Sequence, residues 1–288
     1  MVQVIGEIGG TSSRWAVLAG GTVSIWPMKG DRWPGFNPLS GDGGGFSKAI
    51  GDLFRNAQPE ALTAAEVYIY GAGCGSEERK QRMAQAMSLV WPKAQVEVDT
   101  DLMGAAIGLC GKDPGMVLIL GTGMNAGHYD GHRLHRPMPS LGYLLGDEAS
   151  GADIGRHLLQ DAFYGRIPVE VRARIFGESG PVLSEVLARI HQAPHPAREL
   201  AACTALLAPH LDEHYVQDLI QGRFHALAEL LTLFFTPEQL EHVHATGSVA
   251  YGFREILADC LLDRGMTLTV VEPDPLPGLV RHHQQQVL

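Results

Sequence analysis

Residues 118–131 read LILGTGMNAGHYDG, a glycine-rich stretch that begins inside an apolar run. Its residues 121–126 match G-x-G-x-x-G/A, the pattern of a dinucleotide-binding turn. Such a turn must open a helix, because the helix N-terminus holds the pyrophosphate. Residues 127–131 instead predict a short strand that ends at the hairpin signal Asp130-Gly131. The sequence therefore predicts a glycine loop between two hairpin strands, whose successive backbone N–H groups can bind an anion.

The same pattern occurs a second time, near the N-terminus, where residues 2–26 predict an antiparallel meander of three strands. Shifting this opening by 111 residues aligns four identical pairs without a gap: Ile8 with Ile119, Gly10 with Gly121, Thr11 with Thr122, and Gly20 with Gly131. Strand, Gly-Thr loop, second strand and glycine turn thus occur twice. We expect a duplicated fold, in which two similar halves form a cleft with one phosphate-binding hairpin on each wall.

The rest of the chain alternates predicted strands and helices, which indicates an α/β protein. Further strands are predicted at 66–70, 96–98, 243–246 and 267–271. Helices are predicted at 47–54, 77–90, 102–110, 152–164, 182–190, 198–207, 214–235, from 248 to 262, and 278–288. The apolar run 230–235, LLTLFF, is interpreted as core, with a homodimer face as the alternative.

Composition narrows the class of protein. The 288 residues contain 22 Lys and Arg against 32 Asp and Glu, a net charge of −10, and no basic run. A nucleic-acid partner is therefore not expected. The opening lacks a signal-peptide pattern and no run of about 18 apolar residues occurs, so we expect a soluble cytoplasmic protein without a membrane partner. The cysteines at 74, 110, 203 and 260 lie far apart and are expected to be thiols in a reducing compartment.

Eight stretches in order along nearly the whole chain carry a family resemblance. They are GEIGGTSSRW (6–15), GFNP (35–38), YIYGAGCGSEER (68–79), VEVDTDLMGAAIGLCG (96–111), LILGTGMNAG (118–127), SLGYLLGDEASGADIGRHLL (140–159), ATGSVAYGF (245–253) and GLVRHH (278–283). This set resembles the N-acetylglucosamine kinase branch of the BadF/BadG/BcrA/BcrD-type ATPase family, in the actin/Hsp70/sugar-kinase superfamily. The resemblance implies a two-domain duplicated ribonuclease H-like (actin-like ATPase) fold with a central interdomain cleft.

The resemblance also implies a domain division. Residues 1–107 would form the N-terminal domain with the first phosphate loop and the catalytic aspartate. Residues 108–288 would form the C-terminal domain with the second phosphate loop and the adenosine loop, and its terminal helix would pack back on the N-terminal domain.

Cofactors and site residues follow from the same resemblance, which implies ATP, Mg²⁺ and an amino-sugar substrate. The ATP phosphates would lie against Gly10, Thr11 and Ser12 from one loop and Gly121, Thr122 and Gly123 from the other, and the adenosine against Gly247 and Ser248. Asp101 would be the general base and a sugar ligand, joined at the sugar by Asn37, Asn125 and Asp147. Glu7 would hold the magnesium through water.

Several of these residues also have ordinary structural interpretations. Asp101 stands where a strand meets a helix and is a candidate N-cap, and a cap and a base can coincide. Asp99 is the alternative base. Asn37 precedes Pro38 and is a candidate turn residue. Ser150 and Asp153 resemble a capping box and are interpreted as structural. His242 and His244 have no partner at ligand spacing in the sequence, so no zinc site is expected there.

Three positions depart from the family pattern. Glu7 replaces an aspartate, and its extra methylene displaces the carboxylate. Ser12 follows the first-loop threonine where the family often has lysine or threonine. Met124 replaces a serine, which removes a hydroxyl donor and is expected to narrow the cleft.

The expected activity is ATP-dependent phosphorylation of an amino sugar, with N-acetylglucosamine 6-phosphate as the product. Glucosamine and N-acetylmuramic acid are alternative substrates. A catalytically weak ATP- or sugar-binding sensor is a second hypothesis, motivated by Glu7 and Met124. A radical-enzyme activator is the third, although neither Cys74 nor Cys110 lies in the motif that an iron–sulfur cluster would require.

Overall fold

The computed structural model describes residues 2–29, 31–39 and 41–285. The chain divides into two compact units. Unit 1 contains the residues up to Lys112 and those from Pro275 onward, and unit 2 spans Asp113–Asp274. The division lies five residues beyond the expected boundary, and the terminal helix α13 (Leu276–Gln285) groups with unit 1. The last three residues of the predicted helix 278–288 lie outside the described residues.

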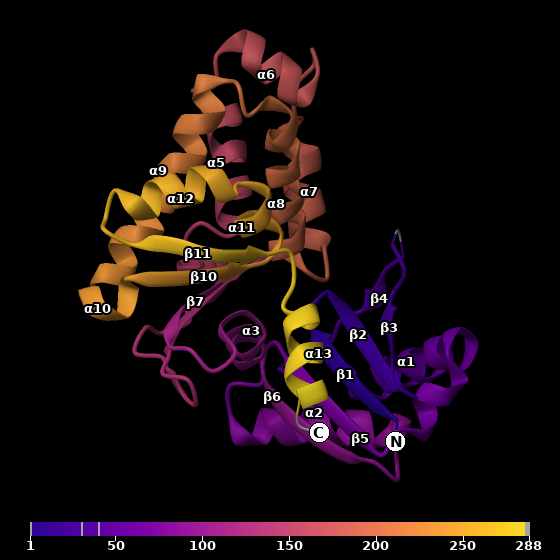
Figure 1. Ribbon diagram of the computed structural model, residues 1–288. Helices are drawn as coiled ribbons and strands as arrows, with labels where there is room; N and C mark the ends of the chain where they lie inside the picture. The colour runs from indigo at the N-terminus through magenta and orange to yellow at the C-terminus, as the bar shows by residue number, and fades with distance from the viewer. Residues whose placement is uncertain (1, 30, 40, 286–288) are drawn as a thin grey trace. The chain divides into compact units, whose positions relative to one another are not determined.

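Unit 1 is built on a sheet with the strand order β3-β2-β1-β5-β6 (Figure 1). Its strands are β1 (Gln3–Ile8), β2 (Ser12–Ala19), β3 (Thr22–Trp26), β5 (Glu66–Gly71) and β6 (Gln95–Thr100), with the short β4 (Trp33–Pro34) paired to β2. Strands β1, β2 and β3 form the predicted antiparallel meander, and β5 and β6 continue the sheet in parallel with β1.

Both faces of this sheet are covered, because alternate residues of each strand point to opposite faces. Trp15, Val67 and Ile69 lie in one core with residues of α1 (Gly43–Ala57), α2 (Glu77–Val90) and the 3₁₀ turn Pro59–Thr63. Ile5 and Tyr70 point to the other face and pack against buried residues of α13. Helix α3 (Asp101–Cys110) packs on α13.

Unit 2 repeats this topology with the strand order β11-β10-β7-β8-β9. Its strands are β7 (Gly115–Leu120), β8 (Met124–Tyr129), β9 (Leu134–His135), β10 (His242–Thr246) and β11 (Thr267–Glu272). Strands β7, β8 and β9 are antiparallel neighbours, whereas β10 and β11 run parallel to β7. The predicted duplication is therefore confirmed at the level of sheet topology.

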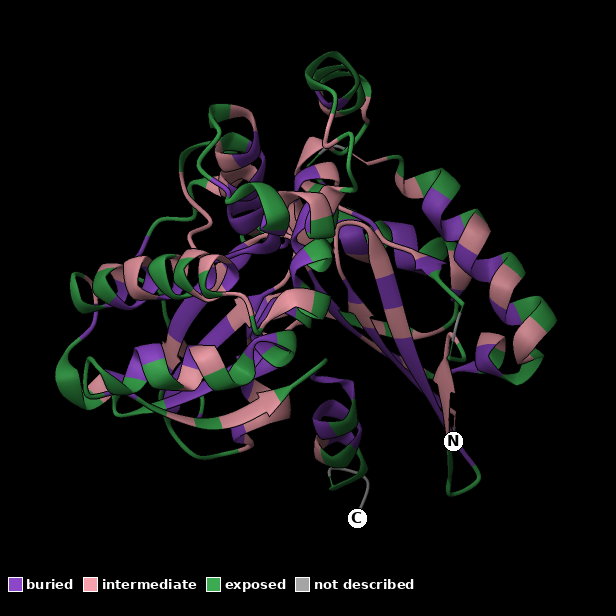
Figure 2. Ribbon diagram, turned by 90° about the horizontal axis from the view of Figure 1, so that it is seen from above, coloured by how far each residue is buried: buried purple, intermediate pink, exposed green. Residues whose placement is uncertain are grey.

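Helices supply most of unit 2. They are α4 (Gly142–Leu145), α5 (Gly151–Tyr164), α6 (Val169–Phe176), α7 (Leu183–Gln192), α8 (Pro196–Thr204), the 3₁₀ turn Ala205–His210, α9 (His214–Thr232), α10 (Pro237–Leu240), α11 (Ser248–Gly252) and α12 (Arg254–Leu262). Buried and exposed stretches alternate along the longer helices (Figure 2). The run 230–235 is split: Leu231 and Phe235 are buried in the core, whereas Leu233 is 72% exposed just after α9 ends.

Candidate active site

The first glycine loop joins β1 to β2 and is braced by the segment around β4. Within the loop, the Gly9 N–H donates to the Ser12 carbonyl at 2.9 Å. The Phe36 N–H donates to the Gly9 carbonyl at 3.0 Å. Because the N–H and C=O of a trans peptide point in opposite directions, the Gly10 N–H points away from Phe36. A side chain at Gly35 would collide with the loop backbone, so this position brings the brace into direct contact.

Glu7 lies on β1, directly before this loop, and is partly buried. It stands opposite Arg14 in the β1–β2 register and beside Tyr70 in the β1–β5 register. Cross-strand partners share one face of a sheet. The Glu7 carboxylate therefore lies on the face that Tyr70 shares with α3 and α13.

Asp101 is the first residue of α3, and the N-cap is its neighbour Thr100. The Thr100 hydroxyl accepts the Met103 N–H at 3.0 Å, so the interpretation of Asp101 as N-cap is wrong. One oxygen of Asp101 accepts the N–H of Leu102 at 2.8 Å. Burial raises the pKa of the neighbouring Cys74 thiol to about 12, with the Asp101 charge as the next cause.

Asp99, the alternative base, has a structural role. Its carboxylate forms an ion pair with Lys80 of α2 at 2.7 Å. The same oxygen accepts the Thr100 N–H at 2.7 Å. These contacts tie Asp99 to α2 and to the end of its own strand. The role of Asp101 as general base stays a prediction.

Asn37 stabilises its own turn. Its side-chain oxygen accepts the Leu39 N–H at 2.9 Å, and its carbonyl accepts the Gly41 N–H at 2.8 Å. Gly73, which has a φ of +78°, lies so close to the Asn37 amide that a side chain there would collide with it. The structure thus accounts for Asn37 as a turn residue, and its sugar contact stays a prediction.

The second glycine loop joins β7 to β8 and is held by the start of α5. The Gly151 N–H donates to the Gly121 carbonyl at 2.8 Å, and the Ala152 N–H donates to the Thr122 carbonyl at 3.1 Å. Peptide planarity then directs the N–H groups of Thr122 and Gly123 away from α5. Two successive N–H groups that face away from their supporting helix form the kind of backbone nest that binds anions.

Asp147 contacts this second loop from a turn before α5. Its carboxylate accepts the Met124 N–H and lies against Gly123. Burial raises the pKa of Asp147 to about 6, and the nearby charges of Glu148 and Asp153 add to the shift, while the Met124 N–H opposes it. Both Asp147 (φ +58°) and Ala149 (φ +63°) have left-handed backbone conformations, which are uncommon for residues other than glycine.

Ser150 is the N-cap of α5, and its hydroxyl accepts the Asp153 N–H at 3.2 Å, which confirms its structural interpretation. The Asp153 carboxylate does not complete a capping box. One of its oxygens accepts the Ala149 N–H at 2.9 Å, and both oxygens bind cationic side chains. Its role is structural, as expected, but through an ion network that its position in the sequence did not indicate.

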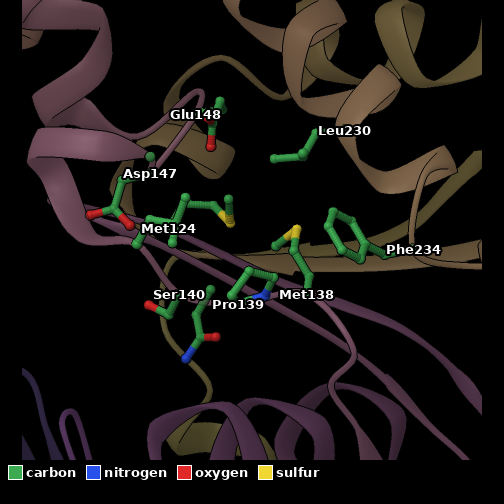
Figure 3. Close-up of a pocket in the computed structure, with 11 residues that line it drawn as sticks. Met124, Met138, Pro139, Ser140, Asp147, Glu148, Leu230 and Phe234 are labelled. Atoms are coloured by element: carbon green, nitrogen blue, oxygen red, sulfur yellow. The ribbon is translucent and has the colours of Figure 1, made fainter.

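A cavity of about 70 Å³ lies beside the second loop, and every lining residue belongs to unit 2. Figure 3 shows the thioethers of Met124 and Met138 and the side chains of Leu230 and Phe234 gathered around one space, with Asp147 and Glu148 at its edge. Met124 is 8% exposed and faces this apolar space. On the same strand, the amide oxygen of Asn125 accepts a hydrogen bond from Arg136 at 2.9 Å.

The predicted adenosine loop follows β10. Gly247 has a φ of +108°, and a side chain there would collide with the Leu120 carbonyl at the end of β7. Its N–H donates to Glu272 of β11 at 3.3 Å. Gly247 therefore lies directly against the start of the second glycine loop, and the exposed Ser248 opens α11.

The predicted site residues thus fall into two groups. Unit 1 brings together the loop 9–12 with Glu7. Asn37 lies against Gly73, which follows β5, and Asp101 follows the adjacent strand β6. Unit 2 brings together the loop 121–123, Asp147 and Gly247. Three supporting residues were missed: Gly35 against the first loop, Thr204, whose hydroxyl donates to the Gly151 carbonyl, and Arg223, which binds Asp153. Each of them contacts its partner segment across more than 20 residues of chain, so no local pattern marks them.

Two other kinds of site do not occur in the described part of the chain. Among its His, Cys, Asp and Glu side chains, no group of three or more is arranged to hold a metal ion. None of its helices combines the length and the apolar character needed to cross a membrane.

No protein-family model matches the chain. No curated protein matches it either. Among solved structures, the chain is similar to the "Putative N-acetylglucosamine Kinase" of Porphyromonas gingivalis, with 30% identity, a TM-score of 0.87 and 99% of each chain covered. A "Putative N-acetylglucosamine Kinase" of Chromobacterium violaceum shares 21% identity over 98% of each chain, with a TM-score of 0.70. The ROK family glucokinase of Streptomyces griseus, solved with glucose and AMPPNP, shares 18% identity over 99% of each chain, with a TM-score of 0.58.

Proposed function

Because the chain belongs to the N-acetylglucosamine kinase-like family of sugar kinases, in the actin-like ATPase superfamily, we propose that it transfers the γ-phosphoryl group of ATP to the 6-hydroxyl of N-acetylglucosamine. The enzyme is an ATP-dependent sugar kinase; the sugar and the hydroxyl are the proposed part. The relative whose name supplies this substrate covers the chain from end to end at 30% identity.

The proposal rests on the backbone conformation of the second glycine loop. Its carbonyls are bound by the first N–H groups of α5, so the N–H groups of Thr122 and Gly123 face outward. Phosphoryl transfer depends on positioning and on donors that stabilise phosphate charge. There is open space where a side chain at Gly121 would stand, and likewise at Gly10 of the first loop. Each loop by itself thus has room for phosphate oxygens. We propose that both loops bind the phosphates of ATP, with Thr11 and Ser12 as further hydroxyl donors.

Magnesium prefers oxygen ligands and usually keeps several waters, with one or two carboxylates and substrate phosphates completing its shell. Glu7 is the carboxylate that directly precedes the first loop. A single carboxylate beside a phosphate loop suits this mode of binding, so we assign Glu7 to a water-mediated contact. The metal would neutralise charge on the phosphates.

The sugar hydroxyl must lose a proton as it attacks, and a carboxylate within hydrogen-bond reach speeds this step by about 10²- to 10⁴-fold. We assign that role to Asp101. Its position at the first turn of α3 is fixed by the Thr100 cap and by the Leu102 N–H. Asp147, Asn37 and Asn125 are proposed to bind sugar hydroxyls, and the glycine turn 247–248 is proposed to approach the adenosine.

The test is coupled ADP release with Mg-ATP and a panel of sugars: N-acetylglucosamine, glucosamine, N-acetylmuramic acid, N-acetylmannosamine and glucose. We expect turnover with N-acetylglucosamine, and a loss of at least about 10²-fold in kcat for Asp101→Asn. Asp99→Asn is the matched control, because it removes a neighbouring carboxylate that is bound to Lys80.

If another sugar in the panel is turned over instead, N-acetylglucosamine is wrong as the substrate, but the sugar-kinase activity stands. If Asp101→Asn and Asp99→Asn lower kcat equally, Asp101 is not the general base. If calorimetry detects binding of ATP or sugar but no sugar in the panel is turned over, the proposed phosphoryl transfer is contradicted and the sensor hypothesis is favoured.

A further inference from the structure

The turn that carries Asp147 is held from behind by a buried carboxylate. Asp147 and Ala149 both have left-handed backbone conformations, which cost free energy and persist only where the surroundings enforce them. The Ala149 N–H donates to Oδ2 of Asp153 at 2.9 Å. The Ser150 N–H closes the turn on the Asp147 carbonyl at 3.0 Å. The Asp153 carboxylate thus fixes the end of the turn from which Asp147 projects.

Asp153 is 2% exposed and stays ionised through its partners. Burial by itself would raise the pKa of this carboxyl, but hydrogen bonds from His157, Arg223 and the Ala149 N–H outweigh burial and hold the pKa well below its usual range. Arg156 binds Oδ1 at 2.8 Å. Nε of Arg223 binds Oδ2 at 2.7 Å. Arg223 and the Ala149 N–H therefore share one oxygen, so Arg223 sets the position of the oxygen that holds the turn.

A continuous chain of contacts results. Arg223 on α9 binds Asp153 on α5, and Asp153 binds the Ala149 N–H. The turn presents Asp147, whose carboxylate accepts the N–H of Met124, the residue directly after the second loop. We propose that Arg223 and Asp153 are a positioning pair for the sugar site, which holds Asp147 in the geometry that binds a sugar hydroxyl. The assignment of Asp147 to the sugar rests on the proposed function.

The phosphate loop has a separate anchor. Its carbonyls bind the N–H groups of Gly151 and Ala152, and the Thr204 hydroxyl donates to the Gly151 carbonyl at 2.7 Å. Among the hydrogen bonds of the described residues, none joins Arg223 to these groups. The two anchors predict a division of effects, in which loss of the Arg223 contact weakens sugar binding much more than ATP binding.

Arg223→Gln tests this division. Asp153 keeps Arg156 and His157 as partners in this variant, so we expect the fold to be retained. Arg174→Gln is the matched control, since Arg174 forms a 2.6 Å ion pair with Glu213 elsewhere in unit 2. For Arg223→Gln we expect the sugar KM to rise about tenfold, with the ATP KM and kcat within about twofold of wild type. Arg223→Lys keeps the charge without the guanidinium fork and should recover part of the loss. Arg174→Gln should change none of these constants.

Hydrogen exchange tests the same pair without substrate. The Ala149 amide should exchange about tenfold faster in Arg223→Gln than in wild type, and at the wild-type rate in Arg174→Gln. If Arg223→Gln and Arg174→Gln have the same Ala149 exchange rate and the same sugar KM, Arg223 and Asp153 do not position the turn. A wild-type protein that turns over no sugar would overturn the proposed function alone, because the exchange at Ala149 is measured without any sugar.

Discussion

Asp147 combines a left-handed backbone, a partly buried carboxyl group and a hydrogen bond from the Met124 N–H. An aspartate in the unfolded chain has a pKa of about 3.9, whereas burial raises the pKa of Asp147 in the folded protein to about 6. The folded state therefore binds this proton more tightly than the unfolded state. As the pH rises from about 4 through 6, the buried charge costs stability.

Asp147→Asn should remove that cost. Asparagine tolerates the left-handed conformation and can accept the Met124 N–H. We expect the free energy of unfolding to rise by about 1–2 kcal/mol at pH 8. Two pKa units correspond to about 3 kcal/mol, and solvent screening of the partly exposed carboxyl reduces this value. The gain should shrink as the pH falls towards 4. Urea unfolding between pH 4.5 and 8 measures it, with Asp212→Asn as an exposed control that should stay within about 0.5 kcal/mol of wild type.

The same variant should lose sugar turnover, since the amide cannot replace the ionised carboxylate. A variant that is more stable and less active indicates that Asp147 is kept charged for function at a cost in stability. A stability change that does not depend on pH would contradict this account of the raised pKa.

At the same scale, the sequence located Asp101 and could not settle its role. The sequence Asp99-Thr100-Asp101 offers three capping side chains within three residues. Which of them becomes the N-cap depends on where the helical dihedrals begin, and the structure places Thr100 there. Likewise the sequence could not show that Asp99 reaches Lys80, because that contact joins a strand to a helix 19 residues earlier.

Among the elements, the glycine loops are maintained by close backbone contact with neighbouring segments. Gly35 approaches the first loop and Gly247 approaches the second, and neither position has room for a side chain. Gly247 also combines its φ of +108° with a ψ of 162°, a conformation that is essentially restricted to glycine.

Gly247→Ala should therefore destabilise unit 2 by about 1–3 kcal/mol and weaken ATP binding, because the new methyl group displaces the Leu120 carbonyl and with it the loop. Gly252→Ala is the matched control. It is the last residue of α11, the short helix that Gly247 caps. It has open space where the methyl group would stand, and the substitution should change stability by less than about 1 kcal/mol. Circular dichroism in urea and calorimetry with ATP measure the two effects. Equal results for both variants would mean that Gly247 does not hold the loop.

At this scale the sequence predicted the positions of those strands and helices that depend on local residue patterns. Strands β1, β2, β3 and β7 and the helices at 77–90 and 102–110 begin and end within two residues of their predicted positions. Strand β8 is longer than predicted, since Met124 and Asn125 pair with β7 although they read as loop residues. The contact of Asp147 with Met124 and the Arg223–Asp153 pair depend on how distant segments pack, and no spacing in the sequence encodes them.

On the scale of the whole molecule, the two units share one sheet topology but have separate cores. Unit 1 is discontinuous in sequence, because α13 completes it after the chain has passed through unit 2. Leu279 of α13 is fully buried with Ile5 and Tyr70 of the unit 1 sheet. The repeat predicted the shared topology, and the resemblance implied the return of the last helix.

This arrangement predicts that the two units report on their unfolding through different signals. All four tryptophans, at positions 15, 26, 33 and 91, lie in unit 1, so tryptophan fluorescence follows unit 1, whereas far-ultraviolet circular dichroism follows both units. Leu279→Ala should lower the free energy of unfolding of unit 1 by about 2–5 kcal/mol and move the midpoint of the fluorescence transition to a lower urea concentration. Leu227→Ala, at an equally buried position in the core of unit 2, should move the circular dichroism transition and leave the fluorescence midpoint unchanged.

Each leucine variant is the control for the other, because both remove the same three carbon atoms from fully buried sites. If each variant instead moved both signals by the same amount, the units would unfold as one cooperative structure, and α13 would stabilise the whole chain rather than unit 1 alone. Separate transitions would mean that residues 275–285, although far from β1 and β2 in sequence, stabilise the strands that carry Glu7 and the first glycine loop. Changes at the C-terminus would then affect phosphate binding through the stability of unit 1.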